Sequence, residues 1–379
     1  MKLKLLSLLL LITTISKAQE IFSTAFQGNS PLPLVTIGDE LFVSVFGDNN
    51  ERVAGVYKLP FDNPSAIETV SEASIQPGLG SLYLAHDPEL NFLFATLPNL
   101  IKIDLNQGLP ATDEVFVDGT SLNIGTNNGL IYHEGFIYFP VLTSDNWIIY
   151  RADTLGASAP ELFFTVPFAD NGLVITQIIN NELYYFKYNS NDDADLLKID
   201  LTNPTSETLV SIVDDFGQLF VQSSHYVNNT LFVGLETNSS NPSIIKFDLS
   251  ENLPITAEPI EASITASSVL GITSYENDLY YTNTGDQTIV RLENGALNVS
   301  DFEDIELSVF PNPTSDKLFI KGAIKNQLDY QIIDVLGKRI NEGIYTAEGI
   351  DLSRLDTGIY FVKLTDANGS MTTQKIVKN

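Results

Sequence analysis

The sequence predicts an all-β protein in which a six-bladed β-propeller is followed by a small β-sandwich. A two-strand pattern recurs six times, at spacings of 44 to 52 residues. Its segments, such as FVSVF (42–46) and LYYFKY (183–188), are runs of aromatic and β-branched residues bounded by Asn, Asp and Gly turns. Helical repeats would instead need apolar residues at a spacing of 3.6. The charge of the chain also changes abruptly near residue 308, which predicts a second domain there.

The first 18 residues predict a secretory signal peptide. Lys2 and Lys4 precede an apolar run (5–12), and small residues follow up to Ala18, after which we expect cleavage. The apolar run is too short to span a bilayer, which needs about 20 residues, and no later segment is longer. The chain has no cysteine, so a buried core rather than a disulfide framework must stabilise it. We therefore expect an exported protein without a transmembrane segment.

The repeat occupies residues 19–300. Aligned on one apolar residue, the first strands of the six hairpins are centred on Leu41, Leu93, Ile137, Leu183, Leu231 and Leu279. The second strands each carry one cation, namely Lys58, Lys102, Arg151, Lys198, Lys246 and Arg291. Two further short extended runs separate successive hairpins. Four strands in about 45 to 50 residues is the pattern of a propeller blade, so six repeats predict six blades.

A ring of sheets leaves a seam, which propellers often close by pairing an N-terminal strand into the last blade. IFSTAF (21–26) is a candidate for this closing strand, and ALNVS (296–300) is a rival for the same position. The sequence leaves this choice open.

The recurrent cation has an acidic residue two positions later in five repeats, as in Lys102 with Asp104 and Arg151 with Asp153. Residues i and i+2 share a face of a strand, so we expect each pair to lie side by side, with the acidic residue also capping the next turn. A ligand site repeated on separate blades would not converge on one substrate. The pairs therefore predict a structural role.

Charge divides the mature chain. Residues 19–308 contain eight Lys or Arg and forty Asp or Glu, a net charge of −32 (8 − 40), whereas residues 309–379 contain nine and eight, a net charge of +1 (9 − 8). Residues 301–308 (DFEDIELS) read as an acidic linker. The negative field of the body repels phosphate backbones, so we expect no nucleic-acid partner. Solubility of an exported protein is the simplest explanation of this charge.

No catalytic motif is present: the sequence lacks HExxH, GxSxG and a P-loop. The three histidines of the body, His86, His133 and His225, precede their blade anchors by seven, four and six residues, so they do not occupy one ring around the channel. We predict no catalytic residue and no cofactor. Candidate metal ligands are His133 and His225 with the nearby carboxylates of Asp87 and Glu134, although a histidine at a strand end is usually only hydrogen-bonded. The acidic segment 189–195 (NSNDDAD) leaves a weak calcium site as an alternative.

Better candidates for ligand contact are the loops that enter the inner strand of each blade, because such loops gather around the mouth of a propeller channel. They span 27–31, 76–81, 119–129, 168–172, 214–217 and 264–268. Their Asn, Asp, Ser and Thr residues suit sugars, metals or peptides better than phosphates or carboxylates.

The last seventy residues contain about seven short extended runs, which predict a small β-sandwich. Four elements closely resemble the type A sorting domain of the type IX secretion system of Bacteroidota: an opening PNP, a DVLGK turn, an LxxGIY block and a closing KIVK. The residues that carry the resemblance are Pro311, Asn312, Pro313, Asp334, Gly337, Lys338, Leu355, Gly358, Ile359, Tyr360 and Lys375.

This resemblance covers residues 309–379 and implies an immunoglobulin-like export signal. Its implied partners are the type IX translocon and a sortase-like peptidase that removes the domain, after which the product is released or linked to the cell surface. The rival interpretation is an adhesive β-sandwich that stays on the product. The body resembles six-bladed NHL, YVTN and lactonase-like propellers only in general, so no set of active-site residues is carried over to it.

These observations leave two alternative functions for the body. The first is a secreted or cell-surface propeller that binds a glycan or an extracellular protein. The alternative is a metal-dependent hydrolase, lactonase or lyase with its site in the channel, where a metal-bound water would act as nucleophile or base.

Overall fold

The protein was analysed as a computed structural model. It describes residues 19–47, 52–72, 82–96, 99–122, 128–167, 172–188, 194–213, 220–236, 243–260, 268–293, 295, 308–321, 328–334, 339–346, 349–366 and 371–379. The predicted signal peptide with its cleavage site, residues 301–307 of the predicted linker 301–308 and the rival closing strand 296–300 lie outside these residues. The chain divides into two compact units, Met1–Asn298 and Val299–Asn379. Each unit is described by itself.

The first unit consists of six four-stranded antiparallel sheets. Five of them follow one another along the chain. They are β2 (Ser30–Ile37), β3 (Glu40–Phe46), β4 (Gly55–Pro60) and β5 (Glu68–Glu72); β6 (Leu84–Asp87), β7 (Phe92–Thr96), β8 (Leu100–Asp104) and β9 (Asp113–Val117); β10 (Ile131–His133), β11 (Phe136–Leu142), β12 (Asn146–Asp153) and β13 (Glu161–Pro167); β14 (Gly172–Ile179), β15 (Glu182–Tyr188), β16 (Ala194–Asp200) and β17 (Thr208–Val213); and β18 (Phe220–Val227), β19 (Thr230–Glu236), β20 (Ile244–Asp248) and β21 (Glu258–Pro259). A short helical turn, α1 (Gly119–Leu122), follows β9.

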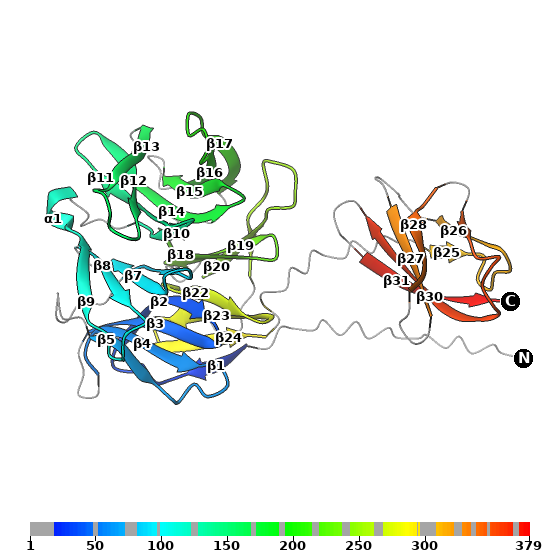
Figure 1. Ribbon diagram of the computed structural model, residues 1–379, viewed down its shortest axis with the longest axis horizontal. Coiled ribbons are helices and arrows are strands. Elements are labelled where there is room, and N and C mark those ends of the chain that lie inside the picture. Colours follow the sequence, from blue (N-terminus) through cyan, green and yellow to red (C-terminus); the bar gives the residue numbers. More distant parts are fainter. Residues whose placement is uncertain are drawn as a thin grey trace, which may run out of the picture. The chain divides into compact units, whose positions relative to one another are not determined.

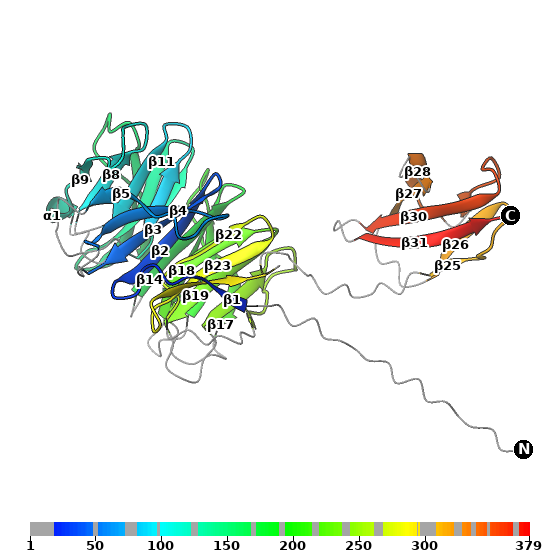
Figure 2. The same cartoon turned by 90° about the horizontal axis from the view of Figure 1, so that it is seen from below.

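The sixth sheet joins the two ends of the unit. It holds β22 (Ile272–Tyr275), β23 (Asp278–Asn283) and β24 (Thr288–Leu292), and its outer strand is β1 (Gln19–Ser23). The innermost strands β2, β6, β10, β14, β18 and β22 each contact the next, and β22 contacts β2 again, which closes a ring. Figure 1 shows these sheets arranged around a common centre, and Figure 2 shows the same unit turned by 90°. The prediction of a six-bladed β-propeller is confirmed.

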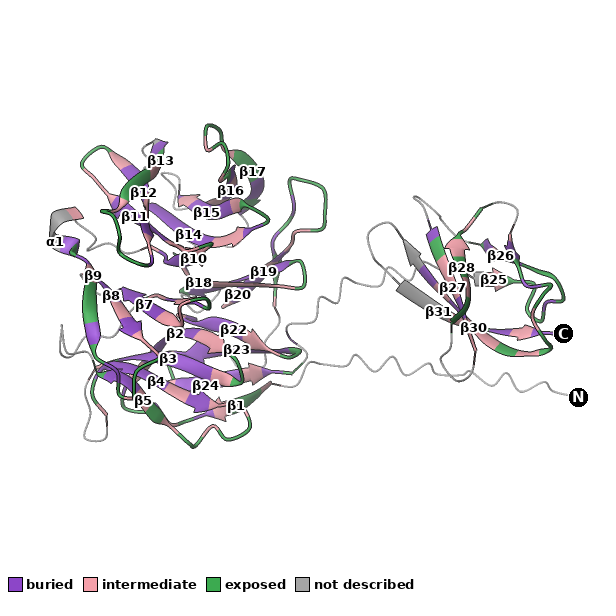
Figure 3. Ribbon diagram, viewed as in Figure 1, coloured by how far each residue is buried: buried purple, intermediate pink, exposed green. Residues whose placement is uncertain are grey.

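The core lies between neighbouring blades. All six anchor residues used to align the repeat, from Leu41 to Leu279, have no exposed surface, because the second strand of each blade is covered by sheets on both sides. Figure 3 shows the same distribution, with buried residues along the strands and exposed residues in the connecting turns and outer edges. The alignment that predicts the blades thus picks out the layer that packs between them.

Strand β1 reproduces the features of an outer strand. Glu20 lies opposite Arg291 and forms an ion pair with it at 2.7 Å, as Glu114 does with Lys102 in another blade. The register of β1 then shifts by one residue at Phe22, which places this ring edge-on to Tyr280 with the centroids 4.8 Å apart.

The same one-residue bulge recurs in the outer strands β5, β9, β13 and β17. Such bulges interrupt the exposed edge of each blade and oppose edge-to-edge pairing with other chains. The predicted closing segment 21–26 therefore overlaps the closing strand at residues 21–23, since the strand begins earlier, at Gln19, and ends at Ser23.

The recurrent cations form ion pairs with residues of neighbouring strands, and Lys102 also interacts electrostatically with Asp104 two residues later in its own strand. Lys102 contacts Glu114 on the neighbouring strand at 2.7 Å, and Lys198 contacts Glu182 at 2.7 Å. Glu114 lies directly opposite Lys102 and Glu182 lies diagonal to Lys198 on the adjacent strand, and the long side chains reach across both positions.

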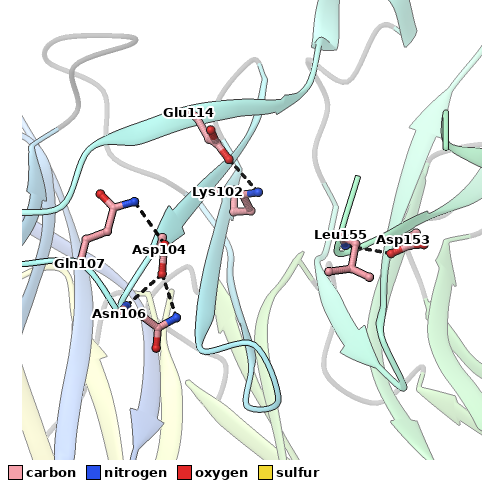
Figure 4. Close-up of polar contacts among 7 residues, drawn as sticks. All are labelled: Lys102, Asp104, Asn106, Gln107, Glu114, Asp153 and Leu155. Atoms are coloured by element: carbon pink, nitrogen blue, oxygen red, sulfur yellow. Dashed lines mark hydrogen bonds and ion pairs between the residues drawn. The ribbon is translucent and has the colours of Figure 1, made fainter. Parts of the chain in front are cut away.

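Four of the acidic residues that follow the cations, Asp104, Asp153, Asp200 and Asp248, cap the next turn, as predicted. The Asn106 and Leu155 backbone N–H groups donate to the Asp104 and Asp153 carboxylates (Figure 4). The Asn106 N–H bond holds the pKa of Asp104 below its ordinary value.

The second unit is a β-sandwich of two sheets. One holds β25 (Ser308–Phe310), β26 (Lys317–Lys321) and β29 (Ile350–Asp351), and the other holds β28 (Arg339–Ile344), β27 (Leu328–Asp334), β30 (Gly358–Asp366) and β31 (Met371–Lys378). Leu318 and Ile350 of the first sheet pack with Ile332 and Val362 of the second in one buried cluster. The predicted sandwich is confirmed. Among the described residues of the chain, no helix is long and apolar enough to cross a membrane.

Candidate functional site

The innermost strands of the ring enclose a narrow channel. A cavity of about 80 Å³ is lined by residues of β2, β14, β18 and β22 and by residues at or just before β6 and β10. An apolar cavity of about 150 Å³ is needed to hold benzene, and a water needs only 10 to 15 Å³, so this part of the channel has room for a few waters at most.

A larger cavity of about 220 Å³ lies at the end where the inner strands begin, and it shares Tyr83, Val174, Val221, Gln222 and Leu270 with the narrow channel. This is the mouth cavity. Residues at the start of β2, β14 and β18 line it, together with residues just before β6, β10 and β22 and Tyr188 from the end of β15. Its large apolar and aromatic walls are Leu32, Leu82, Tyr83, Tyr188, Phe220 and Leu270.

Most of the described side chains that line the mouth cavity are apolar or aromatic, and the loops for which the sequence predicts a polar lining lie mostly outside the described residues. Asn128 and Gln222 supply the only side-chain amides among its described residues, and none of these residues carries a charge at neutral pH. Gln222 donates to Glu236 at 3.1 Å, and the Tyr188 hydroxyl accepts a bond from the Val221 N–H at 2.8 Å. Burial raises the pKa of Tyr188, so it stays protonated.

The predicted contact loops lie mostly outside the described residues. Only 27–31 is described in full, and 119–129 is described up to Leu122 and from Asn128. In the first of these loops Asn29 is buried, and its amide donates to the Gly47 carbonyl at 2.6 Å. The acidic segment 189–195 is described only from Ala194.

Polar side chains of the innermost strands join one blade to the next. His225 of β18 bonds Ser274 of β22 through Nε2 at 2.8 Å, and Gln177 of β14 donates to the Ser224 carbonyl at 3.2 Å. The Thr36 hydroxyl of β2 bonds the Thr273 hydroxyl of β22 at 2.9 Å. These contacts satisfy polar groups near the axis, where an unpaired group would be costly.

The four candidate metal ligands occupy three different blades. His133 ends β10, and its Nε2 bonds the Asn181 amide oxygen at 3.1 Å, while Glu134 in the following turn lies 4.0 Å away. The fully buried Asp87 ends β6 and accepts from the Glu89 N–H at 2.9 Å, which caps the turn after the strand.

His225 lies on β18, two blades beyond β10. Surrounding protein lowers its pKa to about 4, which keeps the imidazole neutral at physiological pH. Within the described part of the chain, no group of three or more His, Asp or Glu side chains is placed to hold a metal ion. The registers also separate the histidines: His86 lies opposite Leu93, His133 opposite Phe136 and His225 opposite Phe232.

The described residues that carry the sorting resemblance belong to several strands and connecting segments of the sandwich. The Asn312 amide bridges to β31, since it donates to the Lys375 carbonyl at 2.8 Å and accepts from the Val377 N–H at 2.9 Å. Asp334 lies opposite Tyr360 in the sheet. Pro311 and Pro313 flank Asn312, Leu355 packs against the sandwich core, and Gly358 begins β30; Gly337 and Lys338 lie outside the described residues.

Sequence reasoning missed the apolar walls of the mouth cavity, because they come from the first residues of inner strands, from residues just before those strands and from the end of β15, rather than from the predicted contact loops. A signal for the outer strands was present. Glu followed by two residues of apolar or β-branched type recurs at 20–22, 68–70, 114–116 and 161–163, and it marks β1 as the outer strand of the last blade.

Comparison with known proteins identifies the second unit. Residues 308–379 match the secretion system C-terminal sorting domain family. An endo-acting ulvan lyase of Formosa agariphila is 27% identical over 101 residues, which cover 25% of this chain. The chain spans only 20% of the length of that relative.

Two solved structures are similar to the body at low identity. A catalytically inactive variant of virginiamycin B lyase from Staphylococcus aureus has a TM-score of 0.47 and 12% identity, over 72% of this chain and 98% of that one. A gluconolactonase from Xanthomonas campestris has a TM-score of 0.44 and 14% identity, over 70% and 97% of the two chains. At these values neither structure bears on the activity of the chain. Residues 308–379 belong to the secretion system C-terminal sorting domain family, and they follow a body with the fold of a six-bladed β-propeller.

Proposed function

We propose that the body is the ligand-binding module of an exported protein and that the ligand enters the mouth cavity. The cavity carries this proposal. It measures about 220 Å³, it lies at the axis, and all six blades contribute to its lining. Ligand sites are typically concave, mostly apolar and supplied with a few polar groups, and the two amides of the described lining fit that pattern.

The sorting domain supports export to the cell surface or the medium. Under the proposal, the chain crosses the periplasm, the type IX translocon recognises residues 308–379, and a sortase-like peptidase removes them. The body then acts outside the cell, either free or anchored. Its excess of acidic residues over Lys and Arg keeps it soluble there.

The metal-dependent hydrolase considered from the sequence gains no support from the described residues. His133 and His225 each bond a polar side chain of the neighbouring blade, and Asp87 caps a turn. Melting the purified protein with and without a chelator tests this alternative. We expect the two melting temperatures to agree. A lower melting temperature in the presence of the chelator would support a bound metal ion.

Binding is tested on an array of glycans and peptides with the purified protein and two variants. Phe220→Ala removes a wall of the mouth cavity, whereas Phe46→Ala removes an equally exposed phenylalanine outside it, since the two side chains are 45% and 43% exposed. We expect array ligands to be lost only with Phe220→Ala. Ligands that bind equally well to both variants would place the site elsewhere.

A further inference from the structure

The mouth cavity has the volume of a single ring with small substituents. At about 220 Å³ it exceeds the roughly 150 Å³ of an apolar cavity that takes benzene, and it falls short of the 300 Å³ at which most ligand pockets begin. A disaccharide or a nucleotide is therefore too large to be enclosed. One ring of the size of phenol or indole fits the space.

The lining selects an uncharged ligand. No described lining residue is ionised at neutral pH, so a carboxylate, a phosphate or an ammonium group would lose its hydration without a partner. A sugar ring carries several hydroxyl groups, and Asn128 and Gln222 are the only side-chain amides of the described lining that could bond them. The glycan expected from the sequence is thus a poor match for this cavity.

Three aromatic walls favour an aromatic ligand over an aliphatic one. Tyr83, Tyr188 and Phe220 come from three different segments around the cavity. Edge-to-face and offset contacts between rings are worth about 0.5 to 1.5 kcal/mol beyond the area they bury.

The Tyr188 ring is anchored at its hydroxyl. The Val221 N–H donates to this hydroxyl at 2.8 Å, and the ring lies against Gly172, its partner on the neighbouring strand. The wall is therefore formed before a ligand arrives, which lowers the entropic cost of binding.

We infer, resting on the proposed function, that the mouth cavity binds one neutral aromatic ring. Two sources can supply this chemistry: a free aromatic molecule, or an aromatic side chain of an extracellular polypeptide. In either case the ring lies among Tyr83, Tyr188 and Phe220, and its polar edge faces the amides of Asn128 and Gln222.

Titration calorimetry of the purified protein with three probes tests the inference. The probes are indole, a blocked Gly-Gly-Trp-Gly-Gly peptide with uncharged ends, and methyl glucoside. We expect indole or the peptide to bind with a Kd below about 1 mM, and methyl glucoside to give no saturable heat. A peptide that binds at least about tenfold more tightly than indole identifies a polypeptide as the source, and the reverse order identifies a free molecule.

Two matched pairs of variants locate the binding. Phe220→Ala and Leu82→Ala remove cavity walls, and Phe46→Ala and Leu253→Ala remove comparably exposed side chains outside the cavity. All four side chains are exposed, so the variants are expected to fold. We expect the first pair to weaken binding of the aromatic probe about tenfold and the second pair to leave it within about twofold.

Three results would overturn the inference: no binding of either aromatic probe, equal effects in the two pairs, or saturable binding of methyl glucoside. A glycan from the array that binds the protein and is lost with Phe220→Ala would overturn it while leaving the proposed function in place. Array ligands that bind both phenylalanine variants equally, or no ligand at all, would instead count against the proposed function.

Discussion

Removing strand β1 tests whether the N-terminal segment closes the ring. Deletion of residues 19–23 takes away the four-residue pairing with β24, the Glu20–Arg291 ion pair and the Phe22 ring against Tyr280. A partly buried phenylalanine contributes about 3 kcal/mol, and each ladder hydrogen bond contributes about 1 kcal/mol. The deletion should therefore cost about 5 kcal/mol, which is a large share of the 5 to 15 kcal/mol that stabilises a typical domain.

For a body of this size that loss corresponds to a drop of about 8 °C in the melting temperature. Fluorescence of Trp147 reports on the body alone, because it is the only tryptophan of the chain and lies buried in β12. Glu20→Gln is the control, since it keeps the strand and removes one exposed ion pair worth less than about 1 kcal/mol. A deletion variant that melts within about 2 °C of the intact protein would refute the closure of the ring by β1.

Three further changes test the inter-blade contacts and the sorting domain. Lowering the pH from 6.5 towards 4 should reduce the free energy of unfolding by up to about 3 kcal/mol because of His225. Its pKa of about 4 in the folded protein lies below its value in the unfolded chain, so the unfolded chain takes up the proton first. Urea titrations should show this loss reduced in His225→Gln; an equal loss in both proteins would contradict it. Gly271→Ala should destabilise the body by about 2 kcal/mol or more, because the new Cβ would clash with the Leu32 carbonyl oxygen. A thermal melt that the substitution leaves unchanged would contradict this close approach. Asn312→Ala removes two hydrogen bonds to β31 and should lower the free energy of unfolding of the sandwich by about 2 kcal/mol, as measured in thermal melts. Deletion of residues 308–379 should leave the protein inside the cells of its host, and secretion without the domain would disprove its role.

The repeat could be predicted because blades are local structures. Each hairpin places its apolar anchor and its cation at fixed spacings, so the sequence alone indicates the four-strand unit and its number. The turns were predictable for the same reason: an aspartate such as Asp104 bonds a backbone N–H only two residues away. The partner of each cation was not, because Glu114 lies opposite Lys102 only once β8 and β9 are paired.

The mouth cavity could not be predicted from the loops. Its walls come from residues as far apart in sequence as Leu32 and Leu270, and they meet only because six sheets share one axis. The closing of the ring also determines which residues the histidines bond. His225 and Ser274 are 49 residues apart and bond across a boundary between blades, so spacing along the chain gave no sign of this pairing.

By itself the sequence determined the all-β class, the count of six blades and the sorting domain, because each is encoded in local patterns of the sequence. Only the tertiary structure decided which strand completes the last blade and what lines the channel mouth. Both depend on contacts between segments more than 200 residues apart, as between Glu20 and Arg291, and these form only when the ring closes.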